Sequence, residues 1–575
     1  MSTEKKLTGY PSIDKPWLTY YSEEAINASL PECTIYEYLW ENNKDNLNDV
    51  ALVYFGKKIT YKELFANIDK TASAFVALGV LKGDIVTIQS LSLPQVVFII
   101  YALSKIGAVA NLVYATSTLE ELRSNIVETQ SAIYITIDSI FDKFDEDINI
   151  ECLKKTIVLS IDDEMGLLAK TVYRLKAKNN CHKNNGNILR WKEFIDCGID
   201  EKVDLTGESN DAVVMVYTGG TTGKSKGVLL SNYNLNVGAL QYWHLGFERQ
   251  KIFLSVLPPF IAFGITVTMH MLLTFGLKTV LGLAVNPSEI SGFIEQYKPN
   301  YVICGTVQAE KMMNVLNQKK IDLSFLTCLS VGGDVLTPKL EERLNNFLER
   351  HNSKIKVAQG YAMSETAAST AASTYTVENV VYKKGTIGVP FVYTNIKIVD
   401  VDTNEELPYG MKGEICINAP CVMMGYYKNE EETRNILKLH SDGKVWVHTG
   451  DVGMIDESGF ITITGRIKRM ILCWENGVCH KVFPKILEDE FLKIECINSI
   501  SIVGKPEQEE NNLVAFVVTE KDVVEQKVLA ELEKFAKDNF EKYECPSKYV
   551  VLKNLPLTTI GKIDYRKLEK MADEE

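Results

Sequence analysis

The chain has 575 residues, 46% of them hydrophobic and 24% charged, and its net charge at pH 7 is −13. This length exceeds what one hydrophobic core can organise, so we expect two or more domains. The acidic balance argues against nucleic acid as the main partner, because phosphate backbones bind basic surfaces. The twelve cysteines form no CxxC pair and no Cys/His cluster at zinc spacing, and the N-terminus lacks an apolar signal core. We therefore expect a cytoplasmic protein with free thiols.

The first 380 residues alternate between helical and strand patterns. Thr60 and Thr118 each precede a glutamate by three positions, which is the capping-box pattern of a helix start, and Gly79 is expected to end the first of these helices. Buried strands are predicted at 84–88, 132–137, 301–304, 326–331 and 355–358. This alternation is typical of largely parallel sheets covered by helices.

An uncharged run from residue 252 to 277 is long enough to be a candidate membrane span. Pro258 and Pro259 divide it into pieces of strand and helix length, so we interpret it as buried α/β core. We find no polybasic patch beside an apolar face that would support membrane association, and we expect no integral membrane segment.

The pattern of predicted elements changes in the second half of the chain. After residue 380 closely spaced strands are separated by Gly, Pro and Asp turns, as at 455–461, which predicts a β-rich subdomain. The last hundred residues predict two strands, an amphipathic helix at 524–540 and another strand. Residues 170–196 are interpreted as a polar surface insertion. The predicted fold class is therefore α/β, with helix-covered mixed sheets, a β-rich subdomain and a small α+β C-terminal domain.

The stretch 216–228, VYTGGTTGKSKGV, has the composition of a phosphate-binding loop. Its G-K-S matches the end of a Walker A loop, but Thr218 stands where that motif requires glycine. The residues from Gly227 onward are apolar and favour a strand, whereas a Walker A loop opens a helix. The spacing thus excludes a true P-loop NTPase and indicates another kind of nucleotide chemistry.

Four further motifs follow this loop, and each is weak alone: 359–365 (QGYAMSE), 447–451 (VHTGD), 465–469 (GRIKR) and 555–563 (LPLTTIGKI). Together the five motifs resemble the adenylate-forming superfamily of acyl-CoA synthetases, peptide-synthetase adenylation domains and firefly luciferase. The resemblance extends from about Thr34 to Lys570 and is greatest to freestanding fatty acyl-CoA or 4-coumarate-CoA ligase-like enzymes. In its phosphate loop, Gly219 replaces a common Ser and Ser225 a common Pro, and the latter change is expected to add loop freedom.

The resemblance implies an organisation and a set of roles. Residues 1–467 would form the adenylation core and residues 468–575 a mobile lid domain, with Arg469 at the hinge. The implied catalytic residues are Lys562, Thr222 and Glu365, of which Thr222 and Glu365 would also hold Mg²⁺. The implied nucleotide-binding residues are Thr218, Gly219, Gly220, Thr221, Gly223, Lys226, Gly360, Tyr361, Ser364, Asp451 and Arg466, with Tyr361 against adenine and Asp451 and Arg466 at the ribose.

The implied reaction joins a carboxylate to ATP to give acyl-AMP and pyrophosphate, after which a thiol displaces AMP. The first step needs no protein nucleophile or general base, because the carboxylate is already ionised near neutral pH. Lys562 would stabilise negative charge between the carboxylate and the α-phosphate. A non-catalytic nucleotide sensor is disfavoured, because a binder needs no Lys562, and luciferase-like oxidation has only the fold in its favour.

The segment 257–264, LPPFIAFG, resembles one wall of the family's acid pocket. No Asp is present there to pair an amino-acid ammonium group, so an α-amino acid is disfavoured. Ile261 stands where many ligases carry His, which makes the wall apolar and favours a medium- or long-chain fatty acid over an aryl or cinnamate-like acid. The expected pocket residues are Phe260, Ile261, Phe263, Gly333, Ala362 and Met363.

The acceptor is the least constrained part of the interpretation. Only thirteen residues follow Lys562, so we expect a freestanding enzyme whose default thiol is CoA. Relatives place a glycine five residues before the proline at 484, but Cys479 stands there and the nearest glycine is Gly477. The 473–483 loop is therefore expected to be about two residues longer near the pantetheine path. An acyl carrier protein, loaded through its phosphopantetheine in a biosynthetic pathway, is the alternative acceptor.

Overall fold

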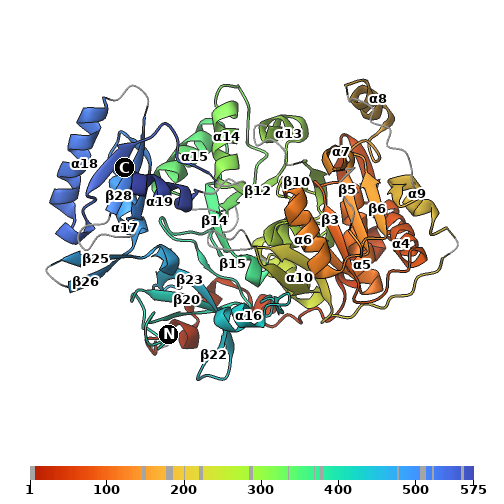
Figure 1. Ribbon diagram of the computed structural model, residues 1–575, viewed down its shortest axis with the longest axis horizontal. Coiled ribbons are helices and arrows are strands. Elements are labelled where there is room, and N and C mark those ends of the chain that lie inside the picture. Colours follow the sequence, from red (N-terminus) through yellow and green to blue (C-terminus); the bar gives the residue numbers. More distant parts are fainter. Residues whose placement is uncertain are drawn as a thin grey trace.

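The computed structural model describes residues 7–144, 150–176, 186–199, 201–218, 225–283, 289–333, 336–367, 369–375, 380–475, 478–505, 513–520, 524–557 and 563–574. In these ranges the chain forms two large helix-covered sheets, a β-rich subdomain and a C-terminal group of strands and helices at the opposite end from the first sheet (Figure 1). The predicted α/β fold class is confirmed.

The first large sheet has the strand order β21-β9-β8-β4-β3-β5-β6-β7. The six strands from β8 to β7 in this order are parallel, and β9 and β21 are antiparallel additions at one edge. Its strands are β3 (Ile85–Gln89), β4 (Val109–Leu112), β5 (Ile133–Ile137), β6 (Lys155–Leu159), β7 (Ile188–Arg190), β8 (Ala212–Tyr217), β9 (Gly227–Ser231) and β21 (Gly425–Tyr426). Its helices are α3 (Ile35–Asn43), α4 (Tyr61–Ala77), α5 (Pro94–Ile106), α6 (Leu119–Thr129), α7 (Asp138–Phe144), α8 (Leu167–Lys176), α9 (Trp191–Asp196) and α10 (Asn232–Leu240).

The second large sheet has the order β18-β15-β14-β13-β12-β10-β11-β1-β2. Its centre is parallel, and both edges end in antiparallel strands. The strands are β1 (Val50–Tyr54), β2 (Lys57–Thr60), β10 (Ile252–Ser255), β11 (Lys278–Leu281), β12 (Tyr301–Gly305), β13 (Cys328–Gly332), β14 (Val357–Ala362), β15 (Ser369–Ala372) and β18 (Val389–Pro390). Its helices are α11 (Ala262–Ile265), α12 (Leu272–Thr274), α13 (Glu289–Tyr297), α14 (Thr306–Leu316) and α15 (Pro338–Arg350).

The β-rich subdomain and the C-terminal elements complete the chain. The subdomain contains β19 (Asn395–Val399), β20 (Gly413–Asn418), β22 (Leu437–Leu439), β23 (Val445–Ile455) and β24 (Ile461–Arg466), with α16 (Glu430–Ile436), and short strands β16 (Thr374–Tyr375) and β17 (Val380–Val381) pair nearby. The C-terminal elements are β25 (Ile471–Glu475), β26 (Val478–Val482), α17 (Pro484–Phe491), β27 (Ile497–Gly504), β28 (Leu513–Thr519), α18 (Glu525–Asn539), β29 (Lys548–Val551) and α19 (Tyr565–Glu574). Near the N-terminus lie the short helices α1 (Pro11–Asp14) and α2 (Glu23–Ile26).

Local sequence chemistry explains several of these boundaries. The hydroxyls of Thr60 and Thr118 accept from backbone N–H groups three residues on, and each glutamate side chain accepts in return, so both predicted capping boxes are confirmed. Gly79 ends the first helix with φ +80°, a backbone conformation that favours glycine. The helix predicted at 524–540 is α18, one residue shorter at each end.

The uncharged segment from residue 252 to 277 is buried core, as interpreted. It contains β10, α11, a π-helical turn at Thr266–Met271 and α12, and its residues from 262 to 277 are almost all buried. In the part of the chain that the structure describes, every helix is too short or too polar to span a bilayer.

The interpretation of residues 170–196 as a polar surface insertion is wrong for its second half. Residues 188–190 form β7, which extends the parallel sheet beside β6. Trp191 and Phe194 of α9 are buried and belong to the same hydrophobic core as α4 and α5. The polar stretch that precedes them led to both short elements being interpreted as part of the insertion, although five of the nine residues from 188 to 196 are apolar.

The predicted division at residues 467 and 468 falls in a short connection. β24 ends at Arg466, one 3₁₀ turn covers Ile467–Arg469, and β25 begins at Ile471. The C-terminal elements have a hydrophobic core of their own, built around Phe491, Leu513 and Leu532. The division itself, and the mobility of the second part, remain predictions.

Candidate active site

The two ends of the glycine-rich loop are fixed by the β8–β9 hairpin. Thr218 N–H donates to the carbonyl of Lys226 at 3.0 Å, and Lys226 N–H donates to Thr218 Oγ1 at 3.3 Å. The predicted loop residues Gly219, Gly220, Thr221, Thr222 and Gly223 lie outside the described residues. The loop therefore connects two antiparallel strands, as the sequence after it indicated, and does not open a helix.

Ser225 compensates for the proline that is common at its position in the family. Its Oγ donates a hydrogen bond of 2.6 Å to the carbonyl of Thr218, across the base of the loop. Proline has no side-chain donor and could not make this bond, and the expected gain in loop freedom remains a prediction.

Lys226 contacts two residues that the sequence did not single out, and one of them, Tyr426, connects it to the candidate metal ligand Glu365. Its Nζ forms an ion pair with Glu432 of α16 and lies 4.9 Å from the ring centre of Tyr426. Tyr426 OH in turn donates to Glu365 Oε1 at 2.7 Å. Burial and the charge of Glu365 raise the pKa of Tyr426, so the phenol stays protonated and holds the carboxylate in place.

Glu365 fits the requirements of a magnesium ligand. It lies in a 3₁₀ turn after β14 and its side chain is buried, and its Oε1 accepts a hydrogen bond from Tyr426. A hard carboxylate oxygen suits Mg²⁺, which commonly takes one or two protein ligands and completes its shell with phosphate and water. Thr222, the other predicted ligand, lies outside the described residues.

Asp451 is the centre of the candidate ribose site. Its Oδ1 accepts from Arg466 Nε and its Oδ2 from Tyr361 OH, each at 2.6 Å. Asp451 faces Arg466 in the β23–β24 ladder, which explains why residues from two motifs meet. Each carboxylate oxygen keeps lone pairs for a sugar hydroxyl. The Tyr361 side chain is largely buried, and its hydroxyl contacts Asp451. The placement of its ring against adenine remains a prediction.

The turn that carries Asp451 is held by His448, which belongs to the predicted VHTGD motif, and by Glu414, which sequence reasoning did not identify. Glu414 accepts from Gly450 N–H at 2.8 Å and pairs with His448 Nδ1 at 2.7 Å. Burial alone would raise the pKa of Glu414, but these bonds lower it below its usual value. His448 Nε2 lies 2.9 Å from His440 Nε2. A single Glu in a strand carries no motif, so only the sheet register could reveal this contact.

A cavity of about 900 Å³ reaches the candidate nucleotide residues. All of the predicted pocket residues line it: Phe260, Ile261, Phe263, Gly333, Ala362 and Met363. Gly360 and Ser364 line it as well, next to Glu365. Tyr114 and Phe260 pack edge to face in its wall, with ring centres 5.4 Å apart. Residues of the 359–365 motif and of the 257–264 segment therefore line the same cavity.

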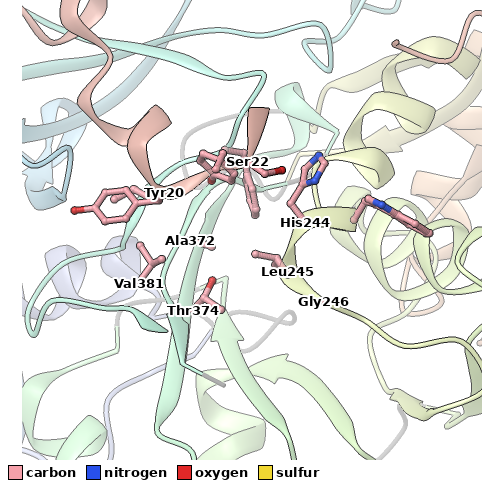
Figure 2. A pocket seen from close by; sticks show the side chains of 12 residues that line it. Tyr20, Ser22, His244, Leu245, Gly246, Ala372, Thr374 and Val381 are labelled. Atoms are coloured by element: carbon pink, nitrogen blue, oxygen red, sulfur yellow. The ribbon is translucent and has the colours of Figure 1, made fainter. Parts of the chain in front are cut away.

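A second cavity of about 270 Å³ adjoins the first. The two share lining residues, namely His244, Leu245, Gly246, Ala372 and Thr374. In Figure 2, His244 and Leu245 lie on one side of the smaller cavity, and Tyr20 and Val381 lie on the other. The two cavities are therefore neighbours with a common wall, and the smaller one is also lined by Tyr20, Tyr21 and Ser22 of the N-terminal segment.

Lys562 lies outside the described residues, but the chain on both sides of it is placed. Leu557 and Ile563 form an antiparallel bridge, and Leu557 lines the main cavity. Arg469 is bound entirely to C-terminal elements. Its guanidinium pairs with Glu488 at 2.6 Å, donates to the Ile502 carbonyl at 3.2 Å and stacks on Tyr565 at 3.9 Å.

Comparisons with known proteins agree with this arrangement. Residues 39–427 match the AMP-binding enzyme family, and residues 487–562 match the AMP-binding enzyme C-terminal domain. The chain is 28% identical over 566 residues to a long-chain-fatty-acid–CoA ligase of Bacillus subtilis, covering 96% of this chain and 97% of that protein. It is also 28% identical over 466 residues to a probable 4-coumarate–CoA ligase of Dictyostelium discoideum, covering 79% and 81%.

Solved structures share the fold at lower identity. ATP-bound MatB from Rhodopseudomonas palustris has a TM-score of 0.78 at 22% identity, covering 94% of this chain and 99% of that one. A benzoate CoA ligase from Burkholderia xenovorans has a TM-score of 0.76 at 19% identity, covering 93% and 99%. Because the two family matches together span most of its length, the chain belongs to the AMP-binding enzymes.

Proposed function

We propose that this AMP-binding enzyme is an acid–thiol ligase that activates a carboxylic acid as acyl-AMP and transfers the acyl group to CoA. The carrying observation is that one cavity joins the apolar wall around Phe260 to the turn of Glu365. The acid and the nucleotide can therefore meet in one enclosed site. ATP, Mg²⁺ and CoA are the cofactors that this chemistry requires.

The residues around the phosphates have definite tasks in this proposal. Lys226 exchanges its partner Glu432 for the β- and γ-phosphates, to which it presents a point charge. Glu365, fixed by Tyr426, supplies a ligand for Mg²⁺, which when bound neutralises phosphate charge. Asp451 receives the ribose hydroxyls while Arg466 and Tyr361 hold its carboxylate. Lys562, which follows the cavity-lining Leu557 by five residues in the sequence, stabilises charge at the α-phosphate.

The lining of the cavity supports a fatty acid as the substrate. Apolar and aromatic side chains predominate, including Leu91, Leu257 and Ile303. Among the described lining residues Glu248 is the one carboxylate, and it is exposed and lies within 3.7 Å of Lys251. A buried ammonium group would thus lack a dedicated partner, which disfavours amino acids. Relatives named for fatty acids and for 4-coumarate leave an aryl or cinnamate-like acid as the second candidate.

The substrate class is tested by incubating the enzyme with ATP, Mg²⁺ and CoA and one acid at a time. Short-, medium- and long-chain fatty acids, benzoate, 4-coumarate and amino acids form the panel. We expect acyl-CoA, detected by mass spectrometry, from the medium- or long-chain acids, with pyrophosphate in equal amount. A higher kcat/KM for 4-coumarate or benzoate would replace the fatty-acid assignment, and comparable rates with free amino acids would refute it.

Leu245 is expected to control the acyl chain length. It lines both cavities, so the larger side chain of Leu245→Trp should keep a long acyl chain from extending from the main cavity into the smaller one. We expect kcat/KM for long-chain acids to fall roughly tenfold to a hundredfold, with medium-chain acids little affected, because only the longer chain needs the second cavity. The matched control is Leu81→Trp, at a leucine that is exposed and lines neither cavity. An equal fall for all chain lengths would contradict the continuous path.

One observation favours an acyl carrier protein as the alternative acceptor. The β25–β26 hairpin, where the sequence departs from its family, exposes the apolar side chains of Leu472, Trp474 and Val478. The ring of His480 in this hairpin stacks on the ring of Tyr543, with ring centres 3.9 Å apart, and this contact holds the hairpin against the segment that follows α18. An exposed apolar hairpin can bind a protein surface. Discharge of the acyl-AMP by a holo carrier protein but not by CoA would establish this alternative.

A further inference from the structure

Lys339 joins helix α15 to the C-terminal elements. It lies in the first turn of α15, and its Nζ donates to the carbonyl oxygens of Glu495 and Ile497 at 2.9 Å each and lies 3.4 Å from Glu520 Oε1. An ammonium group has three N–H donors, so these three acceptors match its hydrogen-bonding capacity. Figure 1 shows α15 beside the C-terminal strands. One side chain thus connects two parts of the molecule that are far apart in the sequence.

The end of the C-terminal sheet that Lys339 contacts is also the end from which the chain continues toward the acid cavity. Ile497 pairs with Thr519 at the end of β28, and β28 runs parallel to β29. The start of β27 and the ends of β28 and β29 therefore lie at one end of this sheet. After Val551 the chain leaves β29 and continues to Leu557, which lines the main cavity.

The segment that follows β29 is attached to this sheet. Leu552 N–H donates to the carbonyl of Val517 in β28 at 2.8 Å. Leu555 and Ile563, on either side of Leu557, pack against a core cluster formed by β27, β28 and α19. A displacement of the sheet would therefore displace the segment with it, because bonded and packed elements move together.

Helix α15 is fixed to the wall of the main cavity. Phe347 of α15 is fully buried in a cluster that contains residues of β13 and β14. The N–H of Val357, the first residue of β14, donates to Asn345 Oδ1 of α15 at 2.8 Å. β14 ends at Ala362, which lines the cavity. Lys339 therefore extends from an element whose position relative to the cavity is set by core packing.

The acceptors of Lys339 distinguish it from an ordinary surface ion pair. Two of them are backbone carbonyls, so the charge-assisted bonds restrain the strand itself and not a mobile side chain. A second ion pair between the C-terminal elements and the rest of the chain joins Lys481 to Asp402, but these side chains are 44% and 72% exposed. Pairs as exposed as this one contribute little to structure.

We propose that Lys339 is a positioning residue for acyl-AMP formation, because it holds the C-terminal sheet where the segment after β29 reaches the acid cavity. The inference rests on the proposed function, in which Lys562 stabilises charge at the α-phosphate. Lys339 itself lines neither cavity, so it acts through the placement of this segment. Transfer of the acyl group from acyl-AMP to CoA does not require Lys562, so Lys339 affects the first half-reaction and not the second.

The first test compares the two half-reactions of Lys339→Ala in the full-length protein. We expect acyl-AMP formation to slow roughly tenfold, because the segment is less precisely placed, and transfer from preformed acyl-AMP to CoA to stay within about twofold of the wild type. The matched control is Arg343→Ala on the same helix, whose guanidinium pairs with Glu310 of α14 at 2.8 Å. It removes a cation of α15 without touching the C-terminal elements and should leave both rates unchanged.

A double-mutant cycle separates positioning from general damage. In a Lys562→Ala background, Lys339→Ala should slow acyl-AMP formation by no more than about twofold, because the group that it positions is already missing. The same loss in both backgrounds would overturn the proposal and indicate a merely structural role. Unchanged acyl-AMP formation by the single variant Lys339→Ala would overturn it as well.

Hydrogen–deuterium exchange tests the placement without any enzymatic activity. Once thermal unfolding shows that each variant is folded, we expect the amides of residues 552–557 to exchange at least about threefold faster in Lys339→Ala than in the wild type or Arg343→Ala. Unchanged exchange would overturn the proposal. A wild type that forms no acyl-AMP with any acid would refute the proposed function, whereas the exchange comparison would still decide whether Lys339 holds the segment.

Discussion

Replacing Lys562 with alanine is expected to reduce acyl-AMP formation by about 10²–10³-fold, the usual effect of removing one charge-stabilising group from a transition state. Lys562 is the one cation that the family motif LPLTTIGKI supplies. Its neighbours Leu557 and Ile563 are bridged, and Leu557 lines the cavity where the acid would lie. The effect should appear in kcat, because the charge develops mainly as the carboxylate attacks.

The two half-reactions separate this role from a general loss of structure. With preformed acyl-AMP, Lys562→Ala should still transfer the acyl group to CoA at a rate close to that of the wild type. Lys553→Ala, a change at an exposed lysine on the approach to the same segment, is the matched control and should leave both half-reactions intact. Unchanged adenylation by Lys562→Ala would remove Lys562 from the proposed mechanism.

Replacing Arg469 with proline is expected to spare adenylation and to reduce thioester formation on the order of a hundredfold. Proline fixes φ near −65° and restricts the residue before it, so a backbone rotation at this point becomes unavailable. The family alternates two placements of its C-terminal domain between the half-reactions, and the second placement would be lost. Single-turnover rates of each half-reaction measure the split.

The structure supplies the control for this experiment. Arg469 contacts Glu488, Ile502 and Tyr565, all of which belong to C-terminal elements. Arg469→Ala removes these contacts but leaves the backbone free, so both half-reactions should stay close to the wild-type rates. If Arg469→Ala reproduces the defect of Arg469→Pro, the side-chain contacts rather than backbone rotation are responsible. Equal loss of both half-reactions in the proline variant would refute the hinge assignment.

Features encoded by neighbouring residues could be predicted from the sequence. A capping box needs only Thr60 and the glutamate three positions later, so the start of α4 was predictable without tertiary information. The strand β9 followed from the apolar residues after the glycine loop, whereas its antiparallel pairing with β8 was not predicted. The pocket residues met as expected because they belong to motifs whose relative positions the family fold determines.

Features that depend on contacts between distant segments could not be predicted. Tyr426 and Glu432 lie about sixty residues beyond Glu365 and some two hundred beyond Lys226, and nothing in their local sequence connects them with the phosphate loop. Glu414 reaches Gly450 only through the β20–β23 register. The hydroxyl of Ser225 forms a bond to the Thr218 carbonyl that only the folded hairpin allows.

The most direct test of the central claim is ATP–pyrophosphate exchange in the absence of CoA. An adenylate-forming ligase must incorporate labelled pyrophosphate into ATP only when a suitable acid and Mg²⁺ are present. We predict exchange with medium- or long-chain fatty acids, its loss without the acid, and AMP release when CoA is added. Production of ADP and phosphate at a rate independent of any carboxylic acid would contradict the account.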